Sequence, residues 1–350
     1  MRFELSDDQA LLRNSTRDFL ASELPLEKTR SVMEHSKVGY DPAEWRRLAE
    51  MGYVGLILPA RVGGQGLGAV ELAIVLEEMG RACVPGPFLD VVLAAALVAA
   101  ASADDALVRE VVAGRKLVTI ARDDAPYAGT SAAAVTAGGG RVRGTKYFVP
   151  FAASVDALVV TTADGPVLVD GPFTVTPLQT LDLAQRFADV ALDHAARPLG
   201  GPAELARVDR LAAVGASAML LGLMSRCLET TLAYVQTRQA FKRPIGAFQA
   251  LQHRLADMLL RVESTRSAVY RAAWCLSSGA PEAPLACAAA KAYAGDSARH
   301  VCGEAIQMHG GIGFTWELDL HLYFKRAKTL EQHYGSTEAQ LEAALAAAGY

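Results

Sequence analysis

The chain has 350 residues, of which 51% are hydrophobic and 21% charged, and its formal net charge is −4 at pH 7. A chain of this size can bury a large core and divide into two or three domains. The slightly acidic balance and the lack of a clustered basic run argue against a nucleic-acid-binding surface, so small molecules and other subunits are the expected partners.

The sequence indicates neither export nor a membrane span. The longest apolar run, Leu89 to Ala101, contains Asp90 and is shorter than the roughly 20 residues that cross a bilayer. The first residues carry acids where a signal peptide would be apolar. The five cysteines (83, 227, 275, 287 and 302) lack Cys-x2-Cys spacing and lie among apolar residues. We therefore expect a cytoplasmic protein with reduced core thiols and no metal site.

The first third of the chain is expected to be helical. Ser6 and Asp41 are predicted N-caps, because acids and then apolar residues at helical spacing follow each of them. The stretch from Leu58 to Gly68 is too rich in glycine for helix or strand and must be a loop. It lacks the Lys-Ser/Thr pair of a phosphate-binding P-loop. Another helix is predicted over residues 71–79.

Around Arg115 the pattern changes from helical to strand-like. Short β-branched runs are separated by Gly, Pro and Asp, and cover residues 116–122, 141–149, 155–162, 166–170 and 173–178. Runs this short, with no helical segments between them, exclude βαβ units. They predict a small β domain over residues 115–198.

Residues 199–350 are expected to be helical again. Leu211 to Val235 is apolar nearly all round, which is typical of the central helix of a bundle. This helix is predicted to continue to Phe241, and Pro244 forbids its simple continuation. Apolar residues at helical spacing resume at Leu251, so the two helices should be joined by a short turn in a four-helix arrangement.

Two segments of this region carry a resemblance to a known family. Tyr234 to Met258 contains Tyr-x3-Arg-x2-Phe-x2-Pro-Ile-x2-Phe-Gln, and residues 302–316 contain Gln-x2-Gly-Gly-x-Gly. Both resemble motifs of the acyl-CoA dehydrogenase family of flavoproteins, as does the glycine-rich loop at 58–68. The resemblance extends over the whole chain. It implies an α+β fold with an N-terminal helical domain (1–114), a small β-barrel or sandwich domain (115–198) and a C-terminal four-helix bundle (199–350).

The resemblance implies that the chain binds FAD across a subunit interface. An arginine at a helix end offers a forked donor for phosphate, and a nearby aromatic ring offers a flat apolar face. In the family, such residues together with a glutamine and paired glycines reach the FAD of the neighbouring subunit. The matching positions are Arg238, Phe241, Gln307, Gly310 and Gly311. From spacing alone, an ordinary helical hairpin with a solvated arginine fits equally well.

The β domain resembles the family less closely. Residues 144–149 resemble a strand whose aromatic residue lies against the flavin ring and whose next-but-one residue bonds the ring edge. Phe148 and Pro150 hold these places, and a proline has neither an N–H nor a hydroxyl to donate. Of the family's Thr-Glu-Pro flavin loop, only Pro126 is matched. Ser336, close to the C-terminus, holds a further cofactor-binding position.

The family's reaction needs a carboxylate base, because the α-proton of a CoA thioester must be removed while the β-hydrogen leaves as hydride. The family places this base at one of two positions, which are Tyr334 and Ala212 here. A tyrosine, with an ordinary pKa of about 10, is a poor base at neutral pH, and an alanine cannot act as one. Both positions therefore lack an acid, although the residues that reach a neighbour's FAD are retained.

Three hypotheses follow from this mismatch. The chain can be a subunit of a heteromeric FAD-dependent acyl-CoA dehydrogenase that resembles bacterial enzymes acting on steroid CoA thioesters, in which a homologous partner brings the base. It can instead be a homo-oligomeric enzyme with a relocated base, for which Glu331 and Glu317 are candidates. It can also be a flavin-free scaffold paralogue. The resemblance implies an acyl-CoA substrate, a dimer or tetramer, and electron-transfer flavoprotein as electron acceptor.

Overall fold

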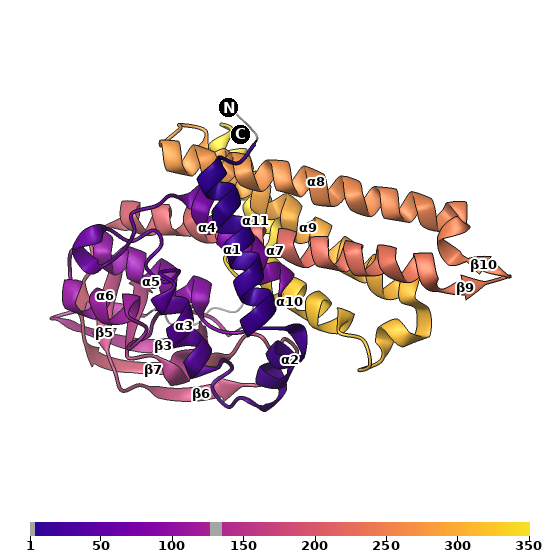
Figure 1. The fold of residues 1–350 in the computed structure, drawn as a ribbon. Coiled ribbons are helices and arrows are strands. Elements are labelled where there is room, and N and C mark those ends of the chain that lie inside the picture. The colour runs from indigo at the N-terminus through magenta and orange to yellow at the C-terminus, as the bar shows by residue number, and fades with distance from the viewer. Residues whose placement is uncertain (1–3, 127–134) are drawn as a thin grey trace. The chain divides into compact units, whose positions relative to one another are not determined.

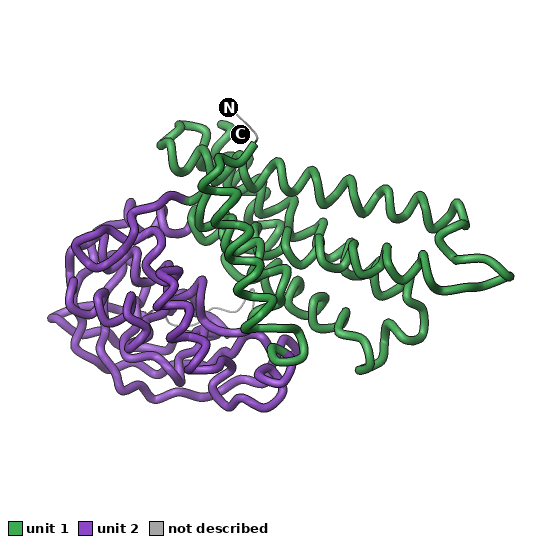
Figure 2. The backbone as a smooth tube through the Cα atoms, viewed as in Figure 1, with its two compact units in different colours: residues 1–29, 69–84, 210–350 green, residues 30–68, 85–209 purple. Residues whose placement is uncertain are grey.

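The structure, a computed structural model, describes residues 4–126 and 135–350. The chain forms two compact units (Figure 2). Unit 1 comprises Met1–Thr29, Ala69–Val84 and Arg210–Tyr350, and unit 2 comprises Arg30–Gly68 and Pro85–Asp209. The succession of helices, then strands, then helices confirms the predicted α+β class (Figure 1). The division at residues 114 and 198 stays a prediction.

The described residues of unit 2 form two four-stranded sheets. One has the order β1-β4-β5-β8 and the other β2-β3-β7-β6. The strands are β1 (Val118–Ala121), β2 (Thr136–Gly138), β3 (Arg141–Pro150), β4 (Ala157–Thr162), β5 (Gly165–Asp170), β6 (Thr174–Leu178), β7 (Phe187–Ala195) and β8 (Arg197–Pro198). β1 and β4 are parallel and every other pairing is antiparallel.

Both sheets contribute alternate side chains to one apolar core. Leu158 and Val160 of β4 belong to the same buried cluster as Val190 and Leu192 of β7. Successive side chains of a strand point to opposite faces. Residues two apart therefore lie on the same face, and that face of each strand packs against the core. The predicted small β domain is confirmed as a two-sheet sandwich.

The described part of unit 2 also contains α2 (Leu26–His35), which begins in unit 1, α3 (Pro42–Glu50), α5 (Phe88–Ala100), α6 (Asp105–Val112) and the first residues of α7 (Pro202–Thr237). The predicted cap of α3 is present, because Asp41 Oδ1 accepts from the backbone N–H of Ala43 at 2.8 Å. The apolar run that is too short to cross a bilayer lies mostly in α5, which is almost entirely buried.

Unit 1 is helical. It contains α1 (Asp7–Glu23), α4 (Ala69–Arg81), most of α7 (Pro202–Thr237), α8 (Gln249–Ser278), α9 (Ala283–His309), α10 (Leu320–Gln332) and α11 (Thr337–Ala347). The predicted cap of α1 is a capping box, in which Ser6 and Gln9 bond each other's backbone N–H. Within the bundle, α9 contacts α8, α10 and α11.

Helix α7 is the central helix that the sequence predicts. It contains an apolar stretch long enough to span a membrane, but 83% of that stretch is buried inside the fold. It crosses α4 where Gly222 lies against the carbonyl of Glu77 and Gly80 lies against the carbonyl of Met219. A Cβ atom on either glycine would overlap the facing backbone, so the two helices approach closely only because both residues lack a side chain.

The connection between α7 and α8 differs from the prediction. Helix α7 ends at Thr237 rather than at Phe241, and a small hairpin of β9 (Gln239–Ala240) and β10 (Arg243–Pro244) follows in place of a simple turn. Its two loop residues, Phe241 and Lys242, have φ values of 52° and 66°. Such a left-handed pair matches a two-residue hairpin turn, and it cannot be part of a right-handed helix.

All five cysteines are free and buried, as expected of core thiols. Cys227 and Cys302 face each other with their sulfur atoms 3.7 Å apart. Among the described residues, no cluster of three or more His, Cys, Asp or Glu side chains is placed to hold a metal ion.

Candidate flavin-binding face and base positions

The hairpin after α7 projects Arg238 and Phe241 away from the bundle. The Phe241 side chain is 90% exposed, and its ring meets the Phe248 ring edge-on at a centroid distance of 6.1 Å. The Arg243 guanidinium lies 4.2 Å from the centre of the Phe248 ring. Arg238 is exposed and has no carboxylate partner in the described part of the chain. The hairpin therefore exposes the forked guanidinium of Arg238 and the Phe241 ring, and places a second guanidinium, that of Arg243, over the Phe248 ring.

The turn after α9 supplies the second group of predicted residues. Gln307 is exposed, and the 3-10 helix η4 (Gly310–Phe314) follows directly after α9. Gly310 has a φ of 63°, which favours glycine. Gly311 has no such restriction, and beyond adjoining backbone a Cβ on either glycine would meet no described atom within 4 Å. The packing of this chain does not require glycine at position 311. Backbone without side chains at these two positions is suited to close approach by a ligand or partner.

Tyr234 and His309 connect these two elements. Their rings are stacked at 4.1 Å and 23°, and the Tyr234 hydroxyl donates to the His309 carbonyl at 3.4 Å. The His309 Nδ1 lies 2.7 Å from the Ala305 carbonyl, and burial lowers the pKa of the imidazole, which favours its neutral form. Because Tyr234 lies one turn before Arg238, the stack fixes the hairpin relative to the turn that follows α9.

This connection was not predicted from the sequence. The signal lay in the two motifs, because Tyr-x3-Arg places an aromatic ring one helical turn before Arg238 and His-Gly-Gly places one directly before Gly310. The structure brings the arginine and glycine motifs of unit 1 together through these two rings.

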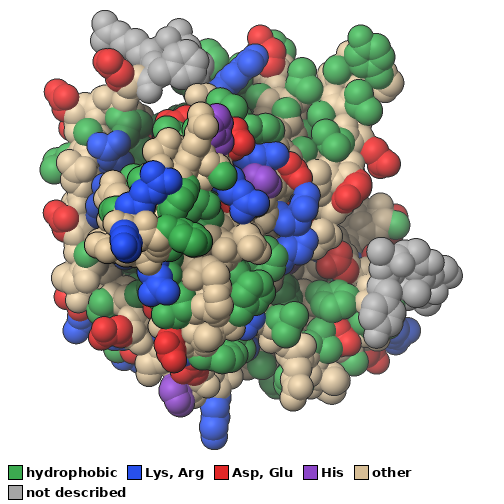
Figure 3. Space-filling view, turned by 90° about the vertical axis from the view of Figure 1, so that its right-hand side faces the viewer, with side chains coloured by type: hydrophobic (Ala, Val, Ile, Leu, Met, Phe, Trp, Pro, Cys, Tyr) green, Lys and Arg blue, Asp and Glu red, His purple; other side chains and the backbone are tan. Residues whose placement is uncertain are grey.

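The same region exposes further large apolar side chains. Phe314 is 76% exposed and Trp316 55% exposed, and the Lys325 ammonium lies 4.5 Å from the Trp316 ring centre. Figure 3 shows a face of the molecule on which exposed hydrophobic side chains lie among Lys and Arg side chains. Apolar rings exposed next to cations are typical of a surface that another subunit or a ligand covers.

In unit 2, Phe148 lies at an irregularity of β3, where the pairing with β7 shifts between Lys146 and Val149. Its φ is 48°, and its backbone N–H donates to the Asp189 carboxylate at 3.2 Å. The ring is partly exposed. Pro150 is buried at the end of β3, opposite Phe187, so the position of the family's flavin-edge contact has no donor.

The loop that holds Tyr334 is fixed by side chains from two helices. Tyr334 has a φ of 65°, and its carbonyl accepts from Gln340 Nε2 at 3.1 Å. The buried Lys291 ammonium donates to the carbonyls of Glu331 and Gly335 at 3.0 and 2.9 Å. Burial lowers the pKa of Lys291 to about 8. The loop at this base position is therefore held in place although it carries no acid.

Of the other candidates, Ala212, Glu331 and Ser336 have structural roles within the chain, whereas Glu317 lies at the surface. Ala212 is 1% exposed in the core of α7. Glu331 is buried, and its carboxylate lies 2.6 Å from the Lys328 ammonium and 3.6 Å from the Arg299 guanidinium. The Ser336 hydroxyl accepts from the Ala339 N–H at 3.2 Å and caps α11. Glu317 is exposed in the segment before α10.

Known proteins match this sequence along most of its length. Residues 6–106 match the family "Acyl-CoA dehydrogenase, N-terminal domain", and residues 210–349 match "Acyl-CoA dehydrogenase, C-terminal domain". Acyl-CoA dehydrogenase IpdE2 of Mycolicibacterium smegmatis is 35% identical over 341 residues, which cover 96% of this chain and 97% of that protein.

Solved structures share the fold as well. The ChsE4-ChsE5 complex from Mycobacterium tuberculosis contains a chain that is 28% identical, with a TM-score of 0.88 over 98% of this chain and 97% of that one. A variant of the steroid ACAD Tcur3481-Tcur3483 is 29% identical, with a TM-score of 0.89 over 98% of both chains.

Proposed function

Because the chain belongs to the acyl-CoA dehydrogenase family, we propose that it is one subunit of a heteromeric FAD-dependent enzyme that dehydrogenates a CoA thioester between its α and β carbons. In this proposal the chain completes the flavin site of a homologous partner, and the partner supplies the carboxylate base. One observation carries the proposal. Tyr334 and Ala212 hold both base positions, whereas the face around Arg238 is retained and exposed.

The described residues fit the pyrophosphate and rings of FAD. Arg238 would hold a phosphate oxygen pair through its forked N–H groups, and Phe241 would lie against a ring. Gly310 and Gly311 would let the backbone approach the cofactor, with the Gln307 amide as a further hydrogen-bonding group. Bound FAD supplies the centre that accepts the β-hydrogen as hydride. The chain's own contribution is binding and orientation.

Two further observations support a partner of the same family. Phe241 and Phe314 are more than three-quarters exposed, which is unusual for aromatic side chains unless another subunit covers them. Of the solved relatives named above, one is described as the ChsE4-ChsE5 complex and the other carries the paired name Tcur3481-Tcur3483. We therefore propose a heterotetrameric or dimeric enzyme, a steroid-derived acyl-CoA substrate, a cytoplasmic location and electron-transfer flavoprotein as acceptor.

Co-purification tests this proposal. The chain is purified alone and together with a homologous subunit encoded beside it, and the flavin spectrum, native mass and acyl-CoA turnover are compared. We expect flavin and turnover only in the complex. In that complex Arg238→Gln should lower FAD affinity at least tenfold, since charge-assisted hydrogen bonds are lost, whereas Arg271→Gln on α8 should not. Stoichiometric FAD and turnover in the chain alone would refute the heteromeric proposal.

A homo-oligomeric enzyme with a relocated base is the second candidate. It is favoured by the position of Glu331, a buried carboxylate three residues before Tyr334. Glu331→Gln should then abolish turnover of the chain alone while leaving FAD bound, and retained turnover would remove this candidate. The absence of a flavin spectrum, both alone and in complex, would instead favour the scaffold paralogue.

A further inference from the structure

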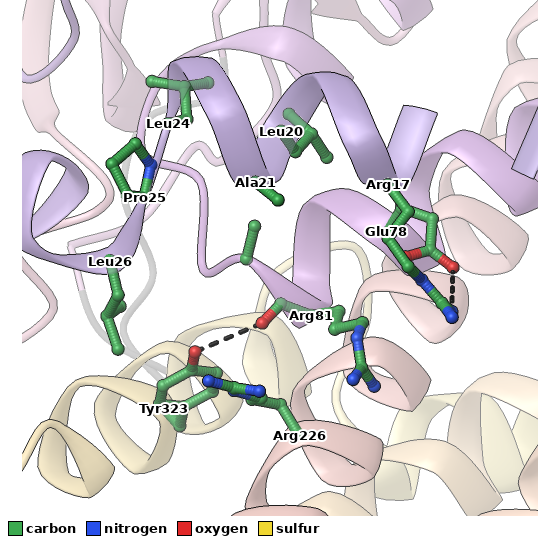
Figure 4. Close-up of a pocket in the computed structure, with 11 residues that line it drawn as sticks. Arg17, Leu20, Ala21, Leu24, Pro25, Leu26, Glu78, Arg81, Arg226 and Tyr323 are labelled. Carbon is green, nitrogen blue, oxygen red and sulfur yellow. Dashed lines mark hydrogen bonds and ion pairs between the residues drawn. The ribbon is translucent and has the colours of Figure 1, made fainter. Parts of the chain in front are cut away.

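A cavity lies in unit 1, apart from the residues discussed above. Its volume is about 280 Å³, and residues of α1, α2, α4, α7 and α10 line it (Figure 4). One side is apolar and is formed by Leu20, Ala21, Leu24, Pro25, Leu26 and Ala82. The other side carries the guanidinium groups of Arg17, Arg81 and Arg226.

Two of these three guanidinium groups are neutralised within the chain. Arg17 binds Glu78 through two hydrogen bonds of 2.9 and 2.7 Å. Arg81 binds the Glu229 carboxylate in the same forked manner, with one of its hydrogen bonds at 2.6 Å. Both pairs use the geometry in which a planar guanidinium matches a carboxylate, and each leaves no net charge.

Arg226 is different, because it has no carboxylate partner in the part of the chain that the structure describes. Its guanidinium lies beside the Tyr323 hydroxyl, which itself donates to the Arg81 carbonyl at 3.1 Å (Figure 4). The Tyr323 side chain is buried and fixed by that bond. The cavity thus has one uncompensated positive charge next to a fixed phenol oxygen, opposite an apolar wall.

We propose that this cavity binds a small apolar carboxylate, with the carboxylate on Arg226 and the hydrocarbon part against the leucines of α1 and α2. One guanidinium balances one negative charge, so a carboxylate fits better than a dianionic phosphate. The apolar wall excludes small hydrophilic anions as preferred ligands. At ~30 Å³ per water-sized group, the volume corresponds to about nine heavy atoms, the size of a medium-chain fatty acid.

Octanoate is a suitable probe. Its binding to the assembled protein is measured by isothermal titration calorimetry, with octan-1-ol and acetate as comparison ligands. We expect saturable octanoate binding with a Kd of about 1 mM or tighter, and much weaker binding of acetate and the alcohol. Arg226→Gln should weaken octanoate binding at least tenfold, because a hydrogen-bonded charge pair is lost. Arg271→Gln, the same change of charge outside the cavity, should leave it unaltered.

A second variant keeps the Arg226 charge and fills the volume of the cavity. Ala21→Trp places a large ring in the cavity from the exposed side of α1, and it should abolish octanoate binding with Arg226 intact. The flavin spectrum of each variant shows whether it is folded and assembled. The proposal is overturned if octanoate does not saturate, if octan-1-ol binds as well, or if Arg226→Gln has no effect. Binding to the isolated chain but not to the complex would also overturn it, since a partner's side chain would then fill the cavity.

Discussion

The crossing of α4 and α7 gives a sharp test of the fold, because the same substitution should have opposite effects at two helical glycines. In Gly222→Ala the new Cβ would overlap the Glu77 carbonyl oxygen and lie 2.6 Å from the Arg81 nitrogen. In Gly303→Ala, on α9, the nearest atom is Phe324 Cε2 at 3.8 Å, an ordinary contact. Alanine is favoured over glycine in a helix by about 1 kcal/mol, so only packing can reverse the sign at position 222.

The magnitude follows from the distance. Removing the overlap of the Gly222→Ala Cβ with the Glu77 carbonyl oxygen, and moving it from 2.6 Å to the ~3.5 Å of an ordinary contact with the Arg81 nitrogen, separates the two helices by at least about 1 Å. A gap of that size removes at least a quarter of the van der Waals contact energy. For one buried side chain, this loss is about 2 kcal/mol. The loss applies to about two side chains, and the higher helix propensity of alanine offsets part of it. The free energy of unfolding should therefore fall by about 3 kcal/mol.

Urea unfolding followed by circular dichroism measures both variants against the unmodified protein. Gly222→Ala should unfold at a clearly lower urea concentration with an unchanged slope, and Gly303→Ala should be neutral or more stable by up to about 1 kcal/mol. If Gly222→Ala is as stable as Gly303→Ala, the backbones of α4 and α7 are not in direct contact at their crossing, and the argument from close approach is wrong.

Three further predictions concern the site. Phe241→Ala should leave the stability of the isolated chain within about 0.5 kcal/mol, because the ring is exposed, yet lower FAD retention in the assembled enzyme, as measured by flavin absorbance after gel filtration. Tyr234→Leu should weaken FAD binding in fluorescence titrations by loosening the stack on His309, whereas Tyr234→Phe, which keeps the ring, should not; equal losses in both would contradict a stacking role. The third concerns Lys291, whose pKa is lowered from 10.5 to about 8 by burial. Between these values the unfolded chain binds more protons, so the free energy of unfolding, measured by urea titration, should rise with pH relative to Lys291→Met, and a flat difference would contradict this.

The local features of the fold could be predicted from the sequence. The caps at Ser6 and Asp41 were found because a capping side chain and its N–H partner lie within a few residues of each other. The hairpin at Phe241 was missed because its two left-handed residues are Phe and Lys rather than the Gly or Asn that usually indicate such a turn. Strand β7 was also missed, although its buried and exposed residues alternate.

Only those residues of the site that belong to a sequence motif could be predicted. Arg238 and Gly310 were found by resemblance, but the rings that connect them depend on how α7 and α9 pack, which no local pattern records. The cavity at Arg226 was not predictable at all. Its lining comes from five helices, and only the three-dimensional positions of Glu78 and Glu229 reveal which arginine lacks a carboxylate.

The exposed Phe241 hairpin also has a consequence for how the protein is produced in the cell. A newly made chain displays that aromatic tip to every chaperone and protease until another polypeptide covers it. In the proposed heteromeric assembly, copies synthesised in excess of the partner should be cleared or aggregate, so the steady-state amount of this chain would follow the scarcer of the two gene products. Balanced expression of both genes would then be a condition for accumulating the protein.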